Sequence, residues 1–309
     1  PPYHIAGMAS IVSSVYSGRR VIQLPNFTAE AWLEAVRKEN VTHAFVVPTM
    51  LSRIVEALAG QEAVGLSSLR AISYGGGKMP QPVIEEAMRL FPDTDFTNAY
   101  GLTETSSTIA LLGPEDHRQA MGSGDEAVRR RIVSVGVPLP TIEVAIRDSE
   151  TGADLPPGER GLIHVRGEQV SGEYRGKGSL LDEDGWFNTR DGGYLDQAGY
   201  LFLEGRMDDV IVRGGENMSP GEIEDVLLAH AAVSDVAVVG VPDEQWGEAV
   251  AAVVVLVSEA SASELQQWVK DRLRSSRTPE RIEFWEELPY NETGKLLRRE
   301  VRAALSEAD

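Results

Sequence analysis

Residues 70–104 read RAISYGGGKMPQPVIEEAMRLFPDTDFTNAYGLTE, and this stretch decides the fold of the first two-thirds of the chain. Its two ends, Arg70–Tyr74 and Asp95–Asn98, are typical of strands, with a helical pattern between them. Strands that alternate with helices pair in parallel through right-handed crossovers, and ligands bind at the carboxyl ends of such strands. Two loops lie at those ends: Gly75–Gly77 follows the first strand and Tyr100–Glu104 the second. The stretch therefore predicts an α/β sheet with ligand-binding loops at its carboxyl edge.

The same alternation of helix and strand continues upstream of these residues. Ala29–Glu39 carries apolar residues at helical spacing, and Thr28 stands where it can cap the first turn. A short strand at His43–Val47 and a helix at Met50–Leu58 follow, and the helix inside the first stretch covers Pro82–Leu90. These elements extend the α/β sheet in the amino-terminal direction.

From about residue 135 to residue 206 the pattern becomes strand-rich. Ile142–Arg147, Leu162–Arg166 and Tyr200–Glu204 are strand-like, and the turn-rich stretch Asp148–Glu159 separates the first two. This segment predicts a small antiparallel β subdomain attached to the α/β sheet.

A third pattern begins near Gly205, and we place a domain boundary between residues 206 and 207. Ser219–Glu222 has the form of a capping box with proline at the first helical position. Predicted strands at 233–241, 249–257 and 281–285 alternate with helices that end near residues 229 and 274. Residues 207–309 therefore predict a compact α+β domain.

Composition excludes several classes of function. The 309 residues include 48 acidic and 29 basic side chains, a net charge of −19, which argues against a nucleic-acid partner and against a polybasic membrane surface. Cysteine is absent, which excludes disulfides, thiolate zinc sites and cysteine nucleophiles and leads us to expect a cytoplasmic location. The longest apolar run, Ala249–Val257, is too short for a membrane span, which needs about 20 residues.

The loop Tyr100-Gly101-x-Thr103-Glu104 is the first candidate site. A hydroxyl and a carboxylate beside a glycine suit a nucleotide phosphate and its Mg²⁺, and the tyrosine ring can cover a base. The triplet Gly75–Gly77 can let the backbone approach a flat ligand closely. Taken separately, Tyr100–Glu104 could equally be a structural turn, and an isolated glycine triplet is more often an ordinary turn than a ligand-binding loop.

Three charged residues in the second half of the chain are further candidates. Asp191 can accept the hydroxyls of a ribose or lie in a surface turn before Gly192-Gly193, and Arg206 can contact a ligand or form a salt bridge. Lys295 follows Gly294 in a loop and suits a developing anion, although a lysine in a loop is usually solvated. The five histidines have no metal-binding spacing and no G-x-S-x-G motif is present, so zinc and serine hydrolases are disfavoured.

Taken in order, these segments resemble the adenylate-forming superfamily of acyl- and aryl-CoA synthetases, luciferases and nonribosomal adenylation domains. The resemblance covers nearly the whole chain. It rests on seven segments: Pro2-x-His4-x-x-Gly7, Gly75–Gly77, Tyr100–Glu104, Gly158-Glu159, Thr189–Gly193, Gly205–Glu224 and Pro289–Lys295. The order of so many motifs is far more specific than any one of them.

The resemblance implies a role for each candidate residue. In the large domain Gly75, Gly76 and Gly77 line the adenine and the entrance to the acyl pocket, which His4 gates. Tyr100 stacks on the base beside Gly101, with Asn98 near the edge of the base, while Thr103 contacts the α-phosphate and Glu104 holds Mg²⁺. Asp191 and Arg206 bind the ribose, Asp208 is the hinge, Gly215 approaches coenzyme A, and Lys295 bridges the substrate carboxylate and the phosphate.

The implied enzyme is an acid–thiol ligase that uses ATP, Mg²⁺ and coenzyme A. A small carboxylic acid attacks the α-phosphate to give an acyl-adenylate and pyrophosphate; the small domain then rotates and the thiol of coenzyme A attacks. Arg213–Glu224 looks most like fatty-acyl-CoA synthetases, so we expect a fatty acid. Two alternatives stay open: a stand-alone amino- or aryl-acid adenylation domain that loads a carrier protein, and a non-catalytic nucleotide- or CoA-binding remnant. Assembly into a homo-oligomer is also open.

Two departures from the family pattern qualify this expectation. The family's Thr-Gly-Asp-x-Gly is Thr189-Arg190-Asp191-Gly192-Gly193 here. The family's phosphate loop, rich in Ser, Thr and Gly and ending in Pro-Lys-Gly, is not found before His4. We therefore expect residues 1–206 to be the carboxyl-terminal part of a large AMP-binding domain, and residues 1–309 alone not to adenylate.

Overall fold

A computed structural model describes residues 4–59, 65–174, 176, 178–292 and 294–307. Pro2, part of the first family-like motif, lies outside these ranges. The chain forms two compact units: unit 1 comprises residues 1–189 with 193–203, and unit 2 comprises residues 190–192 with 204–309. The chain thus crosses between units three times, at Thr189, Gly192 and Leu203, where the sequence suggests a single crossing at 206.

Unit 1 is built on a five-stranded sheet of order β1-β2-β3-β4-β5. The strands β1 (His43–Val46), β2 (Ala71–Gly75) and β3 (Asp95–Leu102) are parallel. β4 (Ser107–Leu112) and β5 (Val137–Pro138) continue the sheet in antiparallel pairing. The predicted α/β class is confirmed.

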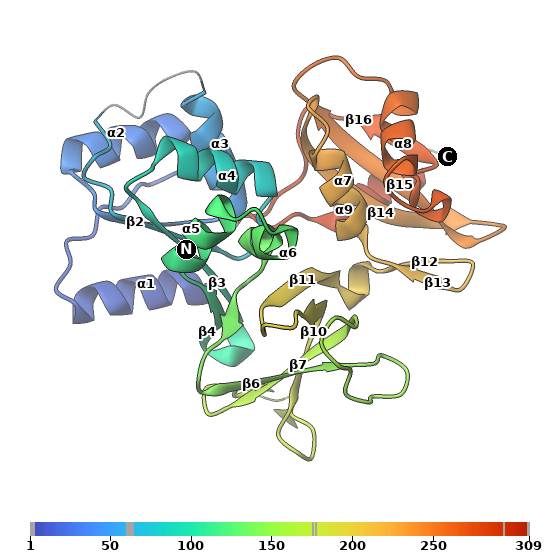
Figure 1. The fold of residues 1–309 in the computed structure, drawn as a ribbon, viewed down its shortest axis with the longest axis horizontal. Helices are drawn as coiled ribbons and strands as arrows, with labels where there is room; N and C mark the ends of the chain where they lie inside the picture. The colour runs from blue at the N-terminus through green and yellow to red at the C-terminus, as the bar shows by residue number, and fades with distance from the viewer. Residues whose placement is uncertain (1–3, 60–64, 175, 177, 293, 308–309) are drawn as a thin grey trace. The chain divides into compact units, whose positions relative to one another are not determined.

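Helices cover both faces of this sheet. α2 (Ala29–Glu39), α3 (Pro48–Ala57) and α4 (Gln81–Leu90) lie on one face, and α1 (Ile5–Tyr16) lies on the other (Figure 1). Thr28 caps α2 as predicted, accepting a hydrogen bond from the Ala31 amide at 3.1 Å. α5 (Pro114–Gly122) and α6 (Glu126–Arg130) follow β4.

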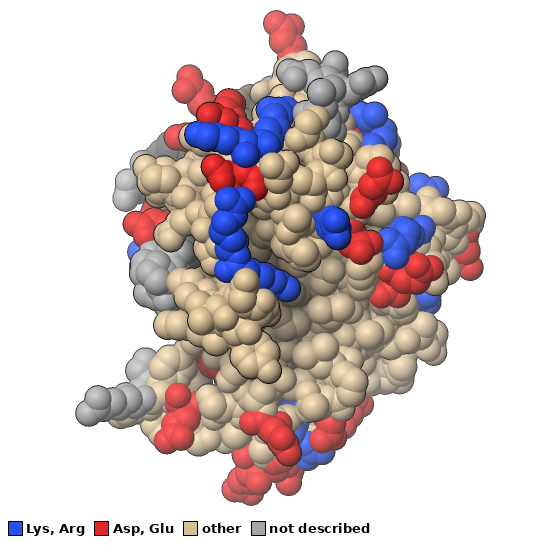
Figure 2. Space-filling view, turned by 90° about the vertical axis from the view of Figure 1, so that its left-hand side faces the viewer, with Lys and Arg blue, Asp and Glu red and all other residues tan. Residues whose placement is uncertain are grey.

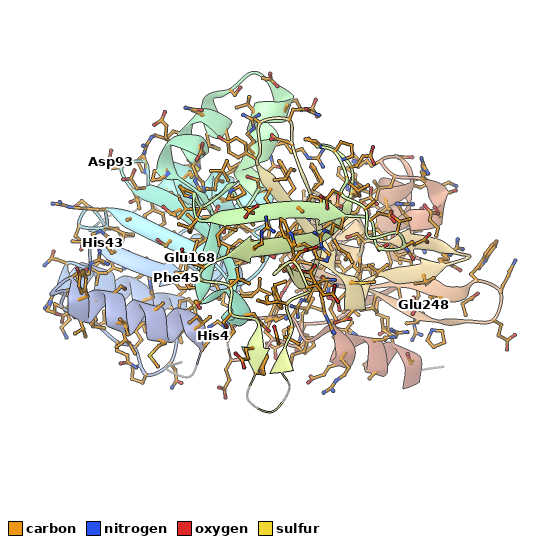
Figure 3. All side chains as sticks on the ribbon, turned by 90° about the horizontal axis from the view of Figure 1, so that it is seen from below. His4, His43, Phe45, Asp93, Glu168 and Glu248 are labelled. Carbon is orange, nitrogen blue, oxygen red and sulfur yellow. The ribbon has the colours of Figure 1, made fainter. Side chains whose placement is uncertain are left out.

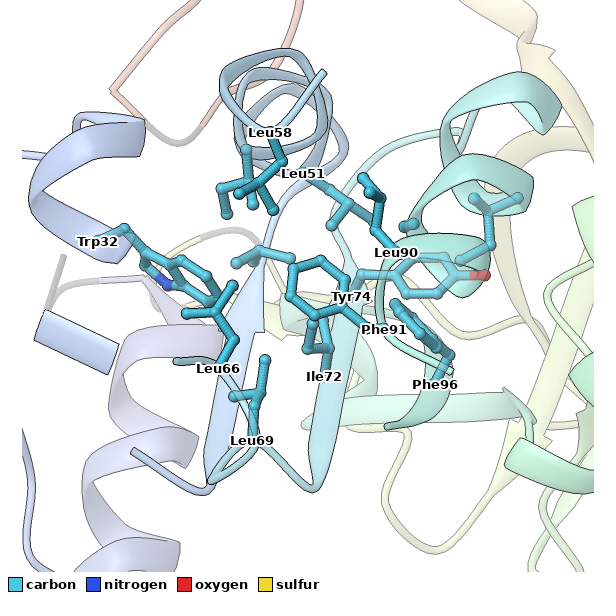
Figure 4. Close-up of a cluster of buried hydrophobic side chains, with 14 of the residues drawn as sticks. Trp32, Leu51, Leu58, Leu66, Leu69, Ile72, Tyr74, Leu90, Phe91 and Phe96 are labelled. Atoms are coloured by element: carbon cyan, nitrogen blue, oxygen red, sulfur yellow. The ribbon is translucent and has the colours of Figure 1, made fainter. Parts of the chain in front are cut away.

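The core of this layer forms because amphipathic helices bury one face each against the sheet. Trp32 of α2, Leu51 of α3 and Leu58 directly after α3 pack with Ile72 and Tyr74 of β2 (Figure 4). The Tyr74 hydroxyl lies 2.8 Å from Nε2 of the buried His117, whose Nδ1 lies 2.7 Å from the Gly113 carbonyl oxygen. Burial lowers the pKa of His117, so its ring is neutral and both of its nitrogens are satisfied within the core.

The strand-rich segment forms a four-stranded sheet of order β11-β10-β7-β6. Its strands are β6 (Ile142–Arg147), β7 (Gly161–Gly167), β10 (Phe187–Leu195) and β11 (Leu201–Arg206), and β6 pairs antiparallel to β7. A short hairpin of β8 (Glu173–Tyr174) and β9 (Gly178–Ser179) lies between β7 and β10 in the chain.

Unit 2 has a sheet of its own. Its strands are β12 (Ile211–Arg213), β13 (Glu216–Met218), β14 (Val233–Asp243), β15 (Gly247–Leu256) and β16 (Arg281–Phe284). Alternate residues of β14 and β15 enter two different cores, one with α7 (Pro220–Leu228) and α8 (Ala262–Lys270), the other with α9 (Arg298–Glu307). Because both faces of these strands are buried, residues 249–256 of β15 form a continuous apolar run and do not alternate.

The structure differs from the sequence-based prediction in four places. Tyr100, Gly101 and Leu102 are not in a loop but extend β3, which pairs with β4 along this part. Asp191 lies within β10 and not in a surface turn. The capping box is wrong, because the Ser219 hydroxyl donates to the Glu204 carbonyl oxygen and makes no cap hydrogen bond. α8 ends at Lys270, four residues before the expected Arg274.

α1 presents an unusually apolar surface. It has no charged residue, and Met8, Val12 and Val15 are 51%, 58% and 74% exposed.

On the face shown in Figure 2, charged side chains gather in patches, and broad areas between them carry none. No helix in the described part of the chain is both long and apolar enough to cross a membrane.

Candidate active site

Two of the three predicted ligand-lining glycines are required by the backbone itself. A Cβ on Gly75 would lie 2.3 Å from the Ala99 carbonyl oxygen on β3, and Gly76 has a φ of +84°. Neither reason applies to Gly77, because it has no positive φ and a Cβ added there would contact only Pro48, at 3.7 Å. Of the three, Gly77 is therefore the position at which close approach by a ligand best explains the absence of a side chain.

Parallel pairing of β2 with β3 brings the predicted residues of unit 1 to one edge of the sheet. Gly75 pairs with Ala99, so the glycine triplet lies beside the end of β3 that leads to Thr103 and Glu104. Tyr100 is only 8% exposed and packs among buried apolar residues, and the buried Asn98 amide donates to the Ser134 carbonyl oxygen at 3.0 Å. Both side chains thus have structural contacts, and their roles at an adenine stay predictions.

The segment after β3 is a strained turn rich in oxygen atoms. Thr103–Thr105 form one 3₁₀ turn. Ser106 and Ser107 follow with backbone φ values of +53° and +101°, which residues other than glycine rarely adopt. The buried Thr105 hydroxyl accepts from the Leu102 amide at 2.9 Å and lies 2.8 Å from the Ser107 carbonyl oxygen. Backbone strain that neighbouring contacts maintain is common at functional sites.

Residues 168–174, termed the strap, form hydrogen bonds with this turn although they lie more than 60 positions further along the chain. The Gln169 amide donates to the carbonyl oxygens of Thr105 and Thr108 at 3.0 and 2.8 Å. Further along the strap, the Tyr174 hydroxyl donates to Glu104 Oε1 at 2.7 Å. Sequence reasoning missed both strap residues, since no local motif marks contacts between positions more than 60 residues apart.

In unit 2 the structure brings Asp191 and Arg206 together. The Arg206 Nε donates to Asp191 Oδ1 at 3.1 Å, and the aspartate side chain is only 14% exposed. Arg190 has a left-handed φ of +61°, so it takes the conformation that glycine adopts most readily. Its guanidinium is 3.8 Å from the Asp208 carboxylate, but both are well exposed, and such a pair contributes little stability.

The remaining predicted residues of unit 2 lie in two hairpin-like turns. Gly214 and Gly215 have φ values of +57° and +82° and connect β12 to β13, as in a two-residue turn of the primed type. Lys295 is exposed in a loop closed by a bridge between Tyr290 and Leu296, and its amide donates to Asn291 Oδ1 at 2.8 Å.

A buried charge network anchors the loop of Lys295. Arg298, at the start of α9, makes a bidentate contact with Glu224 of α7 at 2.5 and 2.7 Å and donates to the Val238 carbonyl oxygen at 2.8 Å. Its Nε is 3.4 Å from Asp209, which directly follows the predicted hinge Asp208. Burial raises the pKa of Asp209, although Arg298 and Lys295 act to lower it. Asp209 and Glu224 lie in the family-like segment Gly205–Glu224 but were given no role from the sequence, and Arg298 lies outside every motif.

The histidines are dispersed. His4 caps α1, its Nδ1 accepting from the Ala6 amide at 3.2 Å, and in Figure 3 it lies well apart from His43 on β1. Within the described ranges no three His, Cys, Asp or Glu side chains cluster as a metal site would require. Gating of an acyl pocket by His4 stays a prediction.

The donor set of unit 1 fits a magnesium ion that arrives with a nucleotide. Mg²⁺ in such sites takes one or two carboxylates together with phosphate oxygens and water. Glu104 supplies a carboxylate in the same short segment of sequence as the hydroxyl-bearing residues Thr103 and Ser106. Loops at the carboxyl ends of neighbouring parallel strands are where α/β proteins bind nucleotides. Fold and site together define an α/β protein whose candidate residues lie at the edge of the sheet where this class binds nucleotides.

Comparison with known families agrees with this class. The model of the AMP-binding enzyme family matches residues 1–175, and that of the AMP-binding enzyme C-terminal domain matches residues 222–295. The chain belongs to the AMP-binding enzyme family, as the order of its motifs predicted.

Individual relatives are similar along nearly the whole chain. The 2-succinylbenzoate–CoA ligase of Bacillus mycoides is 34% identical over 99% of this chain and 61% of its own length. The o-succinylbenzoate CoA synthetase of Bacillus subtilis with its acyl-adenylate intermediate has a TM-score of 0.79, at 33% identity over 98% of this chain and 59% of that one. The amide bond synthetase of Marinactinospora thermotolerans has a TM-score of 0.85, at 32% identity over 97% and 59%. The chain thus spans about three-fifths of the length of these relatives.

Substitution of Gly75 and of Gly77 by alanine should separate a requirement of the fold from a requirement of a ligand. Gly75→Ala forces β2 away from β3 and is expected to reduce the free energy of unfolding by roughly 1–3 kcal/mol. Gly77→Ala should change it by less than about 0.5 kcal/mol but weaken adenine-nucleotide binding about tenfold. Urea unfolding and nucleotide titration measure the two effects. Unaltered nucleotide binding by Gly77→Ala would contradict its ligand role.

Substitution of Glu224 tests the anchor of the Lys295 loop. Glu224→Gln removes one partner of a buried ion pair, so unit 2 should lose roughly 3 kcal/mol of unfolding free energy. Urea unfolding followed by tryptophan fluorescence detects this loss, because three of the five tryptophans, Trp246, Trp268 and Trp285, lie in unit 2. The matched control is Glu264→Gln, because Glu264 is exposed on α8. If both variants unfold at the same urea concentration, the network does not stabilise the unit.

Proposed function

We propose that this chain contributes the adenylate-handling residues of an ATP-dependent acid–thiol ligase, which joins a carboxylic acid to coenzyme A through an acyl-adenylate. The observation that carries the proposal is the placement of the glycine triplet, Thr103 and Glu104 at the carboxyl ends of the neighbouring parallel strands β2 and β3. The relatives named as 2-succinylbenzoate–CoA ligases support it, as does the related synthetase, which has been solved with its acyl-adenylate and with ATP and a magnesium ion.

In this proposal each half of the reaction uses groups present in the chain. Magnesium would be held by Glu104 and would neutralise phosphate charge. Thr103 binds the α-phosphate, Asp191 and Arg206 bind the ribose hydroxyls, and Tyr100, Asn98 and the glycine loop surround the adenine. Lys295 bridges the carboxylate and the phosphate and stabilises the negative charge of the transition state. The Gly214-Gly215 turn serves the thiol step, and Asp208 is the hinge between the two steps.

We revise the expected class of carboxylic acid substrate, which the sequence suggested to be a fatty acid. The fatty acid suggested by Arg213–Glu224 has no support in the names of the Bacillus relatives, which specify 2-succinylbenzoate, an aromatic acid. We propose an aromatic carboxylic acid. The amide bond synthetase among the structural neighbours makes an amine a second acceptor worth testing beside the thiol of coenzyme A.

A panel of acids tests both points. The protein expressed from its complete gene should release pyrophosphate from ATP with substituted benzoates, including 2-succinylbenzoate, at least about tenfold faster than with fatty acids, a difference of about 1.4 kcal/mol in transition-state binding. Coenzyme A, a carrier protein and simple amines are the three acceptors. Product formed only with a carrier protein would replace the ligase by a carrier-loading domain, and no pyrophosphate with any acid would favour the non-catalytic remnant.

Lys295→Ala should divide the reaction into its halves. Loss of a cation at the developing charge is expected to slow adenylation about 100-fold or more. Thioester formation from supplied acyl-adenylate should change less than about threefold, which is under 0.7 kcal/mol. Lys270→Ala, at an exposed position of α8, is the matched control. Equal loss of both halves would contradict the role of Lys295.

A further inference from the structure

The strap and the turn after β3 form one hydrogen-bonded arrangement. The amides of Ser171 and Gly172 both donate to the Glu104 carbonyl oxygen, at 3.0 and 3.3 Å. Gln169 bonds to the carbonyl oxygens of Thr105 and Thr108, one on each side of the strained Ser106-Ser107 pair. The strap therefore fixes the backbone from which the Glu104 side chain projects.

One strap contact reaches the Glu104 carboxylate itself. The Tyr174 hydroxyl donates to Oε1 at 2.7 Å, a short distance typical of a hydrogen bond to a charged oxygen. A carboxylate has two oxygens with several lone pairs, so an oxygen held by a hydroxyl leaves the other able to bind a cation. Outer partners of this kind orient metal-binding carboxylates in many proteins.

The position of Tyr174 favours an orienting role over a packing role. Its side chain is 41% exposed, and it lies in the two-residue strand β8, outside the buried clusters of unit 1. The free energy that its ring gains by burial is correspondingly small. The hydroxyl, placed 70 residues away in sequence from Glu104, makes the specific contact.

We propose that Tyr174 is a positioning residue for Glu104, whose carboxylate it holds in the orientation that binds the magnesium ion of a bound nucleotide. This inference rests on the proposed function, because that function assigns the magnesium to Glu104. It adds a determinant of metal affinity outside the motif of Glu104. Without the hydroxyl the carboxylate rotates freely, and ordering it then opposes binding of the metal.

The test is a magnesium titration of nucleotide binding with the protein expressed from its complete gene. A fluorescent ATP analogue is titrated at a series of Mg²⁺ concentrations against wild type, Tyr174→Phe and the control Tyr16→Phe, whose ring is 93% exposed on α1. Tyr174→Phe should need about tenfold more Mg²⁺ for half-maximal enhancement, the lower end of the range for outer-partner loss. Its affinity for the nucleotide without magnesium should change less than twofold, and Tyr16→Phe should match wild type.

A double variant separates orientation from a general effect on the loop. In a Glu104→Gln background, Tyr174→Phe should cause no further change in magnesium dependence, because the group that it orients has lost its charge. An additive loss in the double variant, or a loss of nucleotide affinity that is independent of magnesium, would show that Tyr174 supports only the hairpin.

The remaining outcomes distinguish this inference from the function on which it rests. A wild-type protein that binds no adenine nucleotide overturns the proposed function, and the inference with it. A wild-type protein that binds nucleotide with magnesium, together with a Tyr174→Phe variant of unchanged magnesium dependence, overturns the inference alone.

Discussion

The parallel pairing of β2 with β3 is the constraint on which the unit 1 site depends. Gly75 opposes Ala99 in this pairing, and a Cβ there would lie 2.3 Å from the carbonyl oxygen of Ala99. The close approach of the two strands is what puts the glycine triplet beside the turn that carries Thr103 and Glu104. Helices α2, α3 and α4 bury the apolar face of these strands, so the core stabilises the same geometry that the site needs.

Strain and its compensation occur together at the candidate residues. Ser106, Ser107 and Arg190 are three of the four described non-glycine residues with a positive φ; Arg190 adjoins Asp191, and the two serines follow Glu104 by two and three positions. In unit 1 the compensation comes from the Thr105 hydroxyl and the Gln169 amide. Such positions persist only where the surrounding structure over-determines them, and so they mark places where geometry matters more than stability.

In unit 2 the feature that needs support is the loop that carries the exposed cation Lys295. Lys295 is held through its backbone by Asn291, while Arg298 three residues on is locked to Glu224 and lies near Asp209. A buried bidentate ion pair fixes the orientation of its two side chains more than it adds net stability, because desolvation offsets much of the attraction. The network thus ties the loop of Lys295 to the segment that contains the predicted hinge.

The sequence by itself determined the α/β class, the alternating helices and strands from α2 to β3 and the order of the motifs, because hydrophobic periodicity and short motifs are local properties. It could not separate Gly75 and Gly76, which the backbone requires, from Gly77, which it does not. Nor could it show that the Ser219 hydroxyl donates to Glu204, or that Gln169, Tyr174 and Arg298 support residues 60 or more positions away. Only the tertiary structure decided these contacts, since strand register and chain packing bring together residues whose spacing in sequence carries no periodic signal.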